Sequence, residues 1–152
     1  MRPTQAPTIL LSDYQEPAFW VETVDLHFAL DPNATRVKST IKFAPNKTRT
    51  DGPHDLRLDG RMLKLISAAV NGKTLQDDEI LLDAEGLTIP ADLIPQNGFT
   101  WTAEVEINPA GNTALEGLYM SNGMYCTQCE AQGFRKITYY PDRPDVMAIF
   151  NV

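Results

Sequence analysis

Apolar and polar residues alternate with a period of two along much of this sequence. The alternation is clearest in residues 24–30, 36–43 and 99–107, where nearly every second side chain is apolar. A period of two sends successive side chains to opposite faces of a β-strand, so each segment is predicted to be a strand with one buried face. Ser39 lies on the apolar side of the second segment. A turn at residues 31–33 separates the first two segments, which therefore predict an antiparallel hairpin with one solvated face.

Shorter strands are predicted elsewhere, at residues 55–58, 62–70, 79–82 and 87–89. Asn71 and Gly72 follow one of them and form the strongest two-residue hairpin signal. No long segment has a helical period. A single helix is expected near the C-terminus, where Asp142 would be the N-cap, Pro144 would lie in the first turn, and Val146, Met147 and Phe150 would face inward. The pattern predicts one all-β domain over residues 1–152, an antiparallel β-sheet or sandwich with a short C-terminal helix.

Charge and composition exclude several classes of protein. The net charge is -7, and lysine and arginine do not cluster, which argues against nucleic acid and anionic membranes as partners. No run approaches the roughly 20 apolar residues of a membrane span. The first 13 residues lack the apolar core of a signal peptide. The two cysteines are too few for a disulfide framework, so a cytoplasmic protein is expected.

The segment 112–146 differs from the rest, being rich in Gly, Cys, Gln and Tyr. It contains the runs Asn-Thr-Ala-Leu-Glu-Gly-Leu-Tyr from residue 112, Cys-Thr-Gln-Cys-Glu-Ala from residue 126, Gly-Phe-Arg from residue 133 and Tyr-Tyr-Pro-Asp-Arg-Pro-Asp-Val from residue 139. These runs resemble the end of the amino-terminal domain of the aminopeptidase N family, which are gluzincin zinc metallopeptidases. The first predicted strand is also similar to that family, so the resemblance covers nearly the whole chain.

The resemblance implies a fold, partners and a site. In this family the domain is a saddle-like β-sandwich that packs beside a thermolysin-like catalytic domain and lends residues to the active-site wall. It implies that Glu130 binds the α-amino group of a peptide substrate, that Gln128 lines the pocket for the first side chain, and that the Glu130–Ala131 peptide bond is cis. The implied partners are the peptide N-terminus and the chain's own catalytic domain, with zinc as the cofactor of the full-length enzyme.

The motifs of zinc catalysis are absent from these 152 residues. Such hydrolysis uses His-Glu-x-x-His, whereas the two histidines here, His27 and His54, lie outside any such motif. The family's Gly-x-Met-Glu-Asn motif is also absent. We therefore expect no catalytic or metal-binding residue in this chain and no activity for this segment alone. A last strand is expected after Phe150, and a catalytic domain after residue 152.

Other interpretations stay open at this stage. A stand-alone β-sandwich module that binds carbohydrate or protein is the alternative function. Cys126 and Cys129 form a C-x-x-C pair, typical of half a zinc site or a redox pair, but no second ligand pair or βαβ unit accompanies it, which favours buried thiols. Arg135 and Arg143 are expected to pair with local carboxylates and to fix the substrate loop. If a catalytic domain covers one face, that face should expose an apolar patch.

Overall fold

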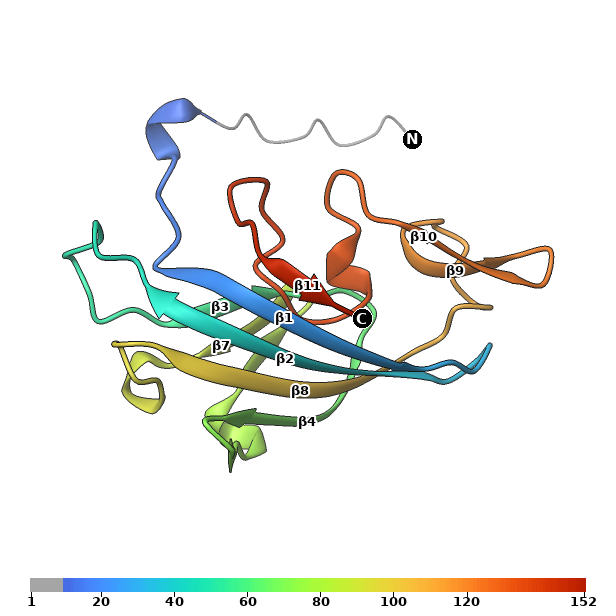
Figure 1. Cartoon of the computed structure of the whole chain (residues 1–152), viewed down its shortest axis with the longest axis horizontal. Helices are drawn as coiled ribbons and strands as arrows, with labels where there is room; N and C mark the ends of the chain where they lie inside the picture. The colour runs from blue at the N-terminus through green and yellow to red at the C-terminus, as the bar shows by residue number, and fades with distance from the viewer. Residues whose placement is uncertain (1–9) are drawn as a thin grey trace.

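The computed structural model describes residues 10–152 and consists mainly of β-strands (Figure 1). A six-stranded sheet has the order β11-β1-β2-β8-β4-β5, a three-stranded sheet has the order β3-β7-β6, and β9 pairs with β10. The strands are β1 (Phe19–Ala29), β2 (Thr35–Pro45), β3 (Leu56–Asp59), β4 (Lys64–Val70), β5 (Lys73–Thr74), β6 (Leu81–Asp83), β7 (Gly86–Ile89), β8 (Phe99–Ile107), β9 (Gly117–Ser121), β10 (Met124–Gln128) and β11 (Ile149–Asn151). The predicted all-β, largely antiparallel fold is confirmed.

Four short 3-10 helices complete the described secondary structure. They are η1 (Leu11–Asp13), η2 (Asp77–Glu79), η3 (Ala91–Leu93) and η4 (Phe134–Lys136). Within residues 10–152 no helix has the length and hydropathy needed to cross a bilayer.

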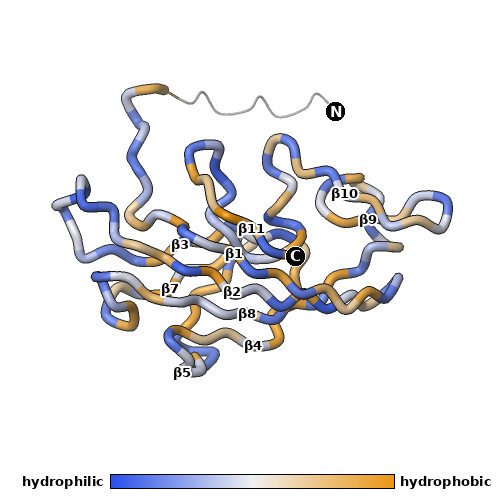
Figure 2. The backbone as a smooth tube through the Cα atoms, in the orientation of Figure 1, coloured by the Kyte–Doolittle hydropathy of each residue, from blue (hydrophilic) through white to orange (hydrophobic). Residues whose placement is uncertain are grey.

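The core forms where the alternating strands β1, β2 and β8 turn their apolar faces toward the three-stranded sheet. Burial alternates strictly along β8, and Val37 of β2 pairs with Val105 of β8 in the antiparallel register. The alternation of hydrophobic and hydrophilic positions along these strands is visible in Figure 2. Opposite them, Leu58, Leu87 and Ile89 are fully buried. Because one face of each strand is buried and the other is wet, the register is set by the sequence pattern itself.

The turn predicted at Asn71 and Gly72 is confirmed. Both residues have positive φ, 48° and 79°, and they join β4 to β5 through the antiparallel pair Val70 and Lys73. Two consecutive residues with positive φ match the right-handed twist of the flanking strands, which is why Asn-Gly favours this turn.

The predicted C-terminal helix is wrong. The chain makes a turn after Arg143 and ends in β11, which runs parallel to β1 with Val24 opposite Phe150. Asp142 does not cap a helix, because its carboxylate accepts hydrogen bonds from the backbone N and Nε of Arg135. The open edge of β1 offers backbone partners that the local helix signals could not reveal.

Candidate functional site

The β9–β10 hairpin presents the segment that contains both predicted site residues. Strand β10 ends at Gln128, and a turn leads from there into η4. Gln128 and Glu130 are both exposed, and the backbone N–H of Glu130 donates to Oε1 of Gln128 at 3.3 Å. The Glu130–Ala131 peptide bond is cis, as the resemblance implies. The two residues therefore lie together at the surface, on one short loop.

The carboxylate of Glu130 is free to bind a ligand. Among residues 10–152, no side chain or backbone group forms a hydrogen bond or ion pair with it; the one hydrogen bond of Glu130 uses its backbone N–H. An exposed carboxylate without a protein partner can accept charge-assisted hydrogen bonds from outside the domain.

Two glycines allow the loop to close tightly on the base of the hairpin. A Cβ added to Gly133 would lie 2.5 Å from the carbonyl oxygen of Gln128 and 2.9 Å from Cα of Cys129. Gly117, which has a φ of 74°, would place a Cβ 2.7 Å from Cβ of Lys136. In addition, the Gly133 N–H donates to the carbonyl of Cys129 at 2.9 Å. The loop that carries Glu130 is thus packed against backbone atoms at both ends.

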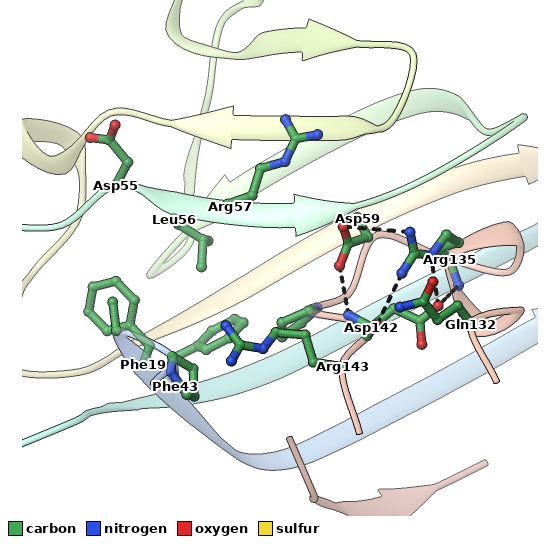
Figure 3. Close-up of a pocket in the computed structure, with 13 residues that line it drawn as sticks. Phe19, Phe43, Asp55, Leu56, Arg57, Asp59, Gln132, Arg135, Asp142 and Arg143 are labelled. Atoms are coloured by element: carbon green, nitrogen blue, oxygen red, sulfur yellow. Dashed lines mark hydrogen bonds and ion pairs between the residues drawn. The ribbon is translucent and has the colours of Figure 1, made fainter. Parts of the chain in front are cut away.

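A buried ion pair lies beneath this loop. Arg135 and Asp142 are only 8% and 7% exposed, and Nε of Arg135 is 3.0 Å from Oδ2 of Asp142. Nη2 of Arg135 also donates to the backbone carbonyl of Asp142 at 3.1 Å. Asp59 extends the network: its Oδ2 accepts from the Asp142 N–H at 2.9 Å, and its Oδ1 is 3.9 Å from Nη1 of Arg135. Figure 3 shows these three side chains converging.

The partners that the sequence left open are now assigned. Arg135 pairs with Asp142, whereas Arg143 pairs with Asp145 at 2.7 Å and donates to the carbonyl of Gln15 at 2.8 Å. Arg143 therefore ties the C-terminal segment to the start of the described chain rather than to the Glu130 loop. The carboxylate of Asp59, in β3, was not anticipated as part of the site, and no local signal marks it.

A cavity of about 370 Å³ lies beside the ion pair, between the edge of β3 and the start of β1 (Figure 3). Its walls include Phe19, Arg57, Gln132 and both members of the ion pair, but neither Gln128 nor Glu130. Arg57 is already paired with Asp83, at 2.6 and 3.0 Å. The guanidinium group of Arg57 is therefore not free to bind a ligand in the cavity.

Neither cysteine belongs to a metal centre in the part of the chain that the structure describes. Cys126 and Cys129 are free, half-buried thiols, and no cluster of three or more potential His, Cys, Asp or Glu ligands occurs among residues 10–152. Burial raises the pKa of the Cys129 thiol, and the charge of Asp142 raises it further. A raised pKa disfavours the thiolate that redox exchange or zinc binding needs. These residues do not fit a zinc ion.

Comparison with known proteins gives a consistent result. The family model described as the Peptidase M1 N-terminal domain matches residues 15–152. Aminopeptidase N of Caulobacter vibrioides is 46% identical over all of this chain, and aminopeptidase N of Escherichia coli is 45% identical over 91% of it. The chain spans only 17% and 15% of the lengths of these two relatives.

Solved structures agree in fold. The crystal structure of Legionella pneumophila aminopeptidase A in complex with aspartic acid superposes with a TM-score of 0.83 at 34% identity, over 92% of this chain and 16% of that one. An M1 zinc metallopeptidase from Deinococcus radiodurans has a TM-score of 0.70 at 17% identity, over 88% of this chain and 31% of that one, which shows a shared fold only. With the family model covering nearly the whole chain and close relatives aligning along it, this chain belongs to the Peptidase M1 N-terminal domain family.

Proposed function

We propose that residues 1–152 form the substrate-anchoring amino-terminal domain of a zinc-dependent aminopeptidase, in which Glu130 binds the α-amino group of a peptide. The single observation that carries the proposal is the exposed carboxylate of Glu130, which has no partner among residues 10–152 and lies on a loop that is closed by hydrogen bonds. The names of the full-length relatives support an aminopeptidase. Zinc is assigned to the catalytic domain of the full-length enzyme, and no role proposed for this chain depends on it.

The chemistry of an exopeptidase accounts for such a carboxylate. A peptide α-amino group has a pKa of about 7.7–8.0 and is largely protonated at neutral pH. Glu130 would accept a charge-assisted hydrogen bond from this ammonium group. An internal peptide segment has no ammonium group, so binding it would leave the carboxylate desolvated and unpaired, which disfavours internal sites. Gln128, two residues earlier, would contact the first side chain of the substrate.

The exposed apolar residues favour a covering domain as a partner. Met147, Ile149 and Val152 are 84%, 67% and 88% exposed and lie close together in the sequence, in or beside β11. Exposed apolar groups at such density are typical of a surface that another part of the protein covers. We assign this covering role to the catalytic domain. A stand-alone binding module is less favoured, because the relatives contain the matching segment as a small part of a much longer chain. The cytoplasmic location stays a prediction.

The proposal is tested by replacing Glu130 in the full-length enzyme. For Glu130→Ala and Glu130→Gln, we expect kcat/KM on an aminoacyl substrate to fall roughly 10- to 150-fold, because a hydrogen bond to a charged group contributes about 1.5–3 kcal/mol. Zinc content should not change. Glu22→Ala is the matched control, since Glu22 is an exposed glutamate on β1 that pairs with Lys42. A kcat/KM of Glu130→Ala within twofold of wild type would show that the assigned role is wrong.

A further inference from the structure

Arg135 and Asp142 are engaged mainly with each other rather than presented to a ligand at the surface, although both line the cavity described above. They are only 8% and 7% exposed, and Nε and Nη2 of Arg135 donate to the carboxylate and the backbone carbonyl of Asp142. An ion pair this deeply buried is a poor source of stability, because the desolvation of both charges offsets most of their attraction. A role in defining local geometry explains the pair better.

That geometry includes the loop with Glu130. The backbone of Arg135 is held on both sides, because its N–H donates to Oδ2 of Asp142 at 3.1 Å and its carbonyl accepts from the Arg61 N–H at 2.9 Å. Only four residues separate Glu130 from Arg135, and the Gly133 N–H to Cys129 carbonyl hydrogen bond closes the turn between them. Fixing Arg135 therefore fixes the point at which the loop returns to the domain.

The ion pair also connects the loop to the second sheet. Asp59 in β3 accepts from the Asp142 N–H, and the backbones of Asp59 and Tyr140 are joined by hydrogen bonds of 2.8 and 3.1 Å. The Glu130 loop is thus connected, through Asp142, to a strand of the second sheet. Small displacements matter in such a site, since a shift of about 1 Å in a positioned group can lower the rate about 100-fold.

We propose that Arg135 and Asp142 are positioning residues for recognition of the substrate amine: their buried ion pair, braced by Asp59, fixes the loop that presents Glu130. The proposal rests on the proposed function of Glu130. It assigns part of the selectivity for a free N-terminus to two further residues that act through the position of Glu130.

The test is a double-mutant cycle in the full-length enzyme with an aminoacyl substrate. Asp142→Asn keeps the shape of the side chain but removes its charge, and we expect kcat/KM to fall about tenfold or more. In the Glu130→Ala background the same substitution should change kcat/KM by less than about twofold. The loop then has no carboxylate left to position against the substrate amine. Asp145→Asn, which breaks the Arg143 pair in the same segment, is the control and should stay near wild type.

Two further measurements separate positioning from general damage. Amide hydrogen exchange of residues 129–133 should accelerate in Asp142→Asn but not in Asp145→Asn. If Asp142→Asn does not fold, Asp59→Asn replaces it. The amide oxygen of asparagine can still accept from the Asp142 N–H, so we expect a smaller loss of kcat/KM, about three- to fivefold, that again vanishes in the Glu130→Ala background.

The outcomes distinguish the two proposals. If Glu130→Ala itself retains wild-type kcat/KM, the function proposed for Glu130 fails. If Glu130→Ala is strongly impaired but Asp142→Asn is neutral, or its effect is undiminished in the Glu130→Ala background, then Glu130 keeps its role and the positioning role of the ion pair is overturned.

Discussion

Thr138 and Ser39 form a buried hydroxyl pair that ties the segment after η4 to the centre of the main sheet. Both residues are fully buried, and Oγ1 of Thr138 donates to Oγ of Ser39 at 3.1 Å. Thr138→Val preserves the size of the side chain but deprives the Ser39 hydroxyl of this partner. Since Thr138 lies two residues from η4, the pair reports on how firmly the segment beneath the Glu130 loop is held.

The expected magnitudes follow from burial. An unsatisfied buried polar group costs about 1–3 kcal/mol, so Thr138→Val should lower the free energy of unfolding by that amount. Ser39→Ala alone leaves the Thr138 hydroxyl without its partner and should have a similar effect. The double variant removes both polar groups and loses only the net hydrogen bond, about 0.5–1.5 kcal/mol. It should therefore be no less stable than either single variant.

Urea denaturation followed by tryptophan fluorescence measures these differences. Trp101 is fully buried in the core, whereas Trp20 is 37% exposed, so unfolding changes mainly the environment of Trp101. The midpoint should shift without a change in the slope, because the surface exposed on unfolding stays the same. The reasoning is refuted if the double variant is destabilised by the sum of the two single effects, since additivity means that the two hydroxyls do not interact.

Gly133→Ala should destabilise the domain by about 1–3 kcal/mol, because the added Cβ would clash with fixed backbone atoms. Gly123 has a φ of 79° and no atom within 4 Å of an added Cβ, so Gly123→Ala should cost only about 1 kcal/mol. Equal losses of stability in urea denaturation would contradict this explanation. The Arg57 side chain holds the pKa of Asp83 at about 2, below its ordinary 3.8, so this stabilisation is complete above pH 3.8 and is lost as the pH falls toward 2. Asp83→Asn should flatten the decline of stability across that window, and an unchanged acid titration followed by circular dichroism would refute the assignment. Residues 1–152 alone should self-associate through the exposed C-terminal residues, and Ile149→Lys should shift sedimentation toward the monomer; a wild-type segment that is already strictly monomeric would count against a covered apolar surface.

The predicted site was only partly accessible from sequence. The resemblance singled out Glu130 and Gln128, but their exposure, and the absence of a partner for the Glu130 carboxylate within residues 10–152, depend on how the hairpin is oriented. The β9–β10 hairpin itself was missed, because its strands lack alternation. Its turn at Asn122 and Gly123 carries the same dipeptide that correctly predicted the turn at Asn71 and was the available signal.

Local chemistry alone determined the alternating strands β1, β2 and β8 and their inward faces. The steric pleat of a strand makes alternation sufficient to place Val37 and Val105 in the core, and Ser39 with them, without knowledge of any distant residue. Only tertiary structure decided what those faces meet: Ser39 finds a partner 99 residues away, and Asp142 finds Asp59 across 83 residues. Asp142 therefore binds Arg135 instead of capping a helix, and the chain end becomes a strand on β1, because backbone and charge pairing across the fold outweigh short-range capping signals.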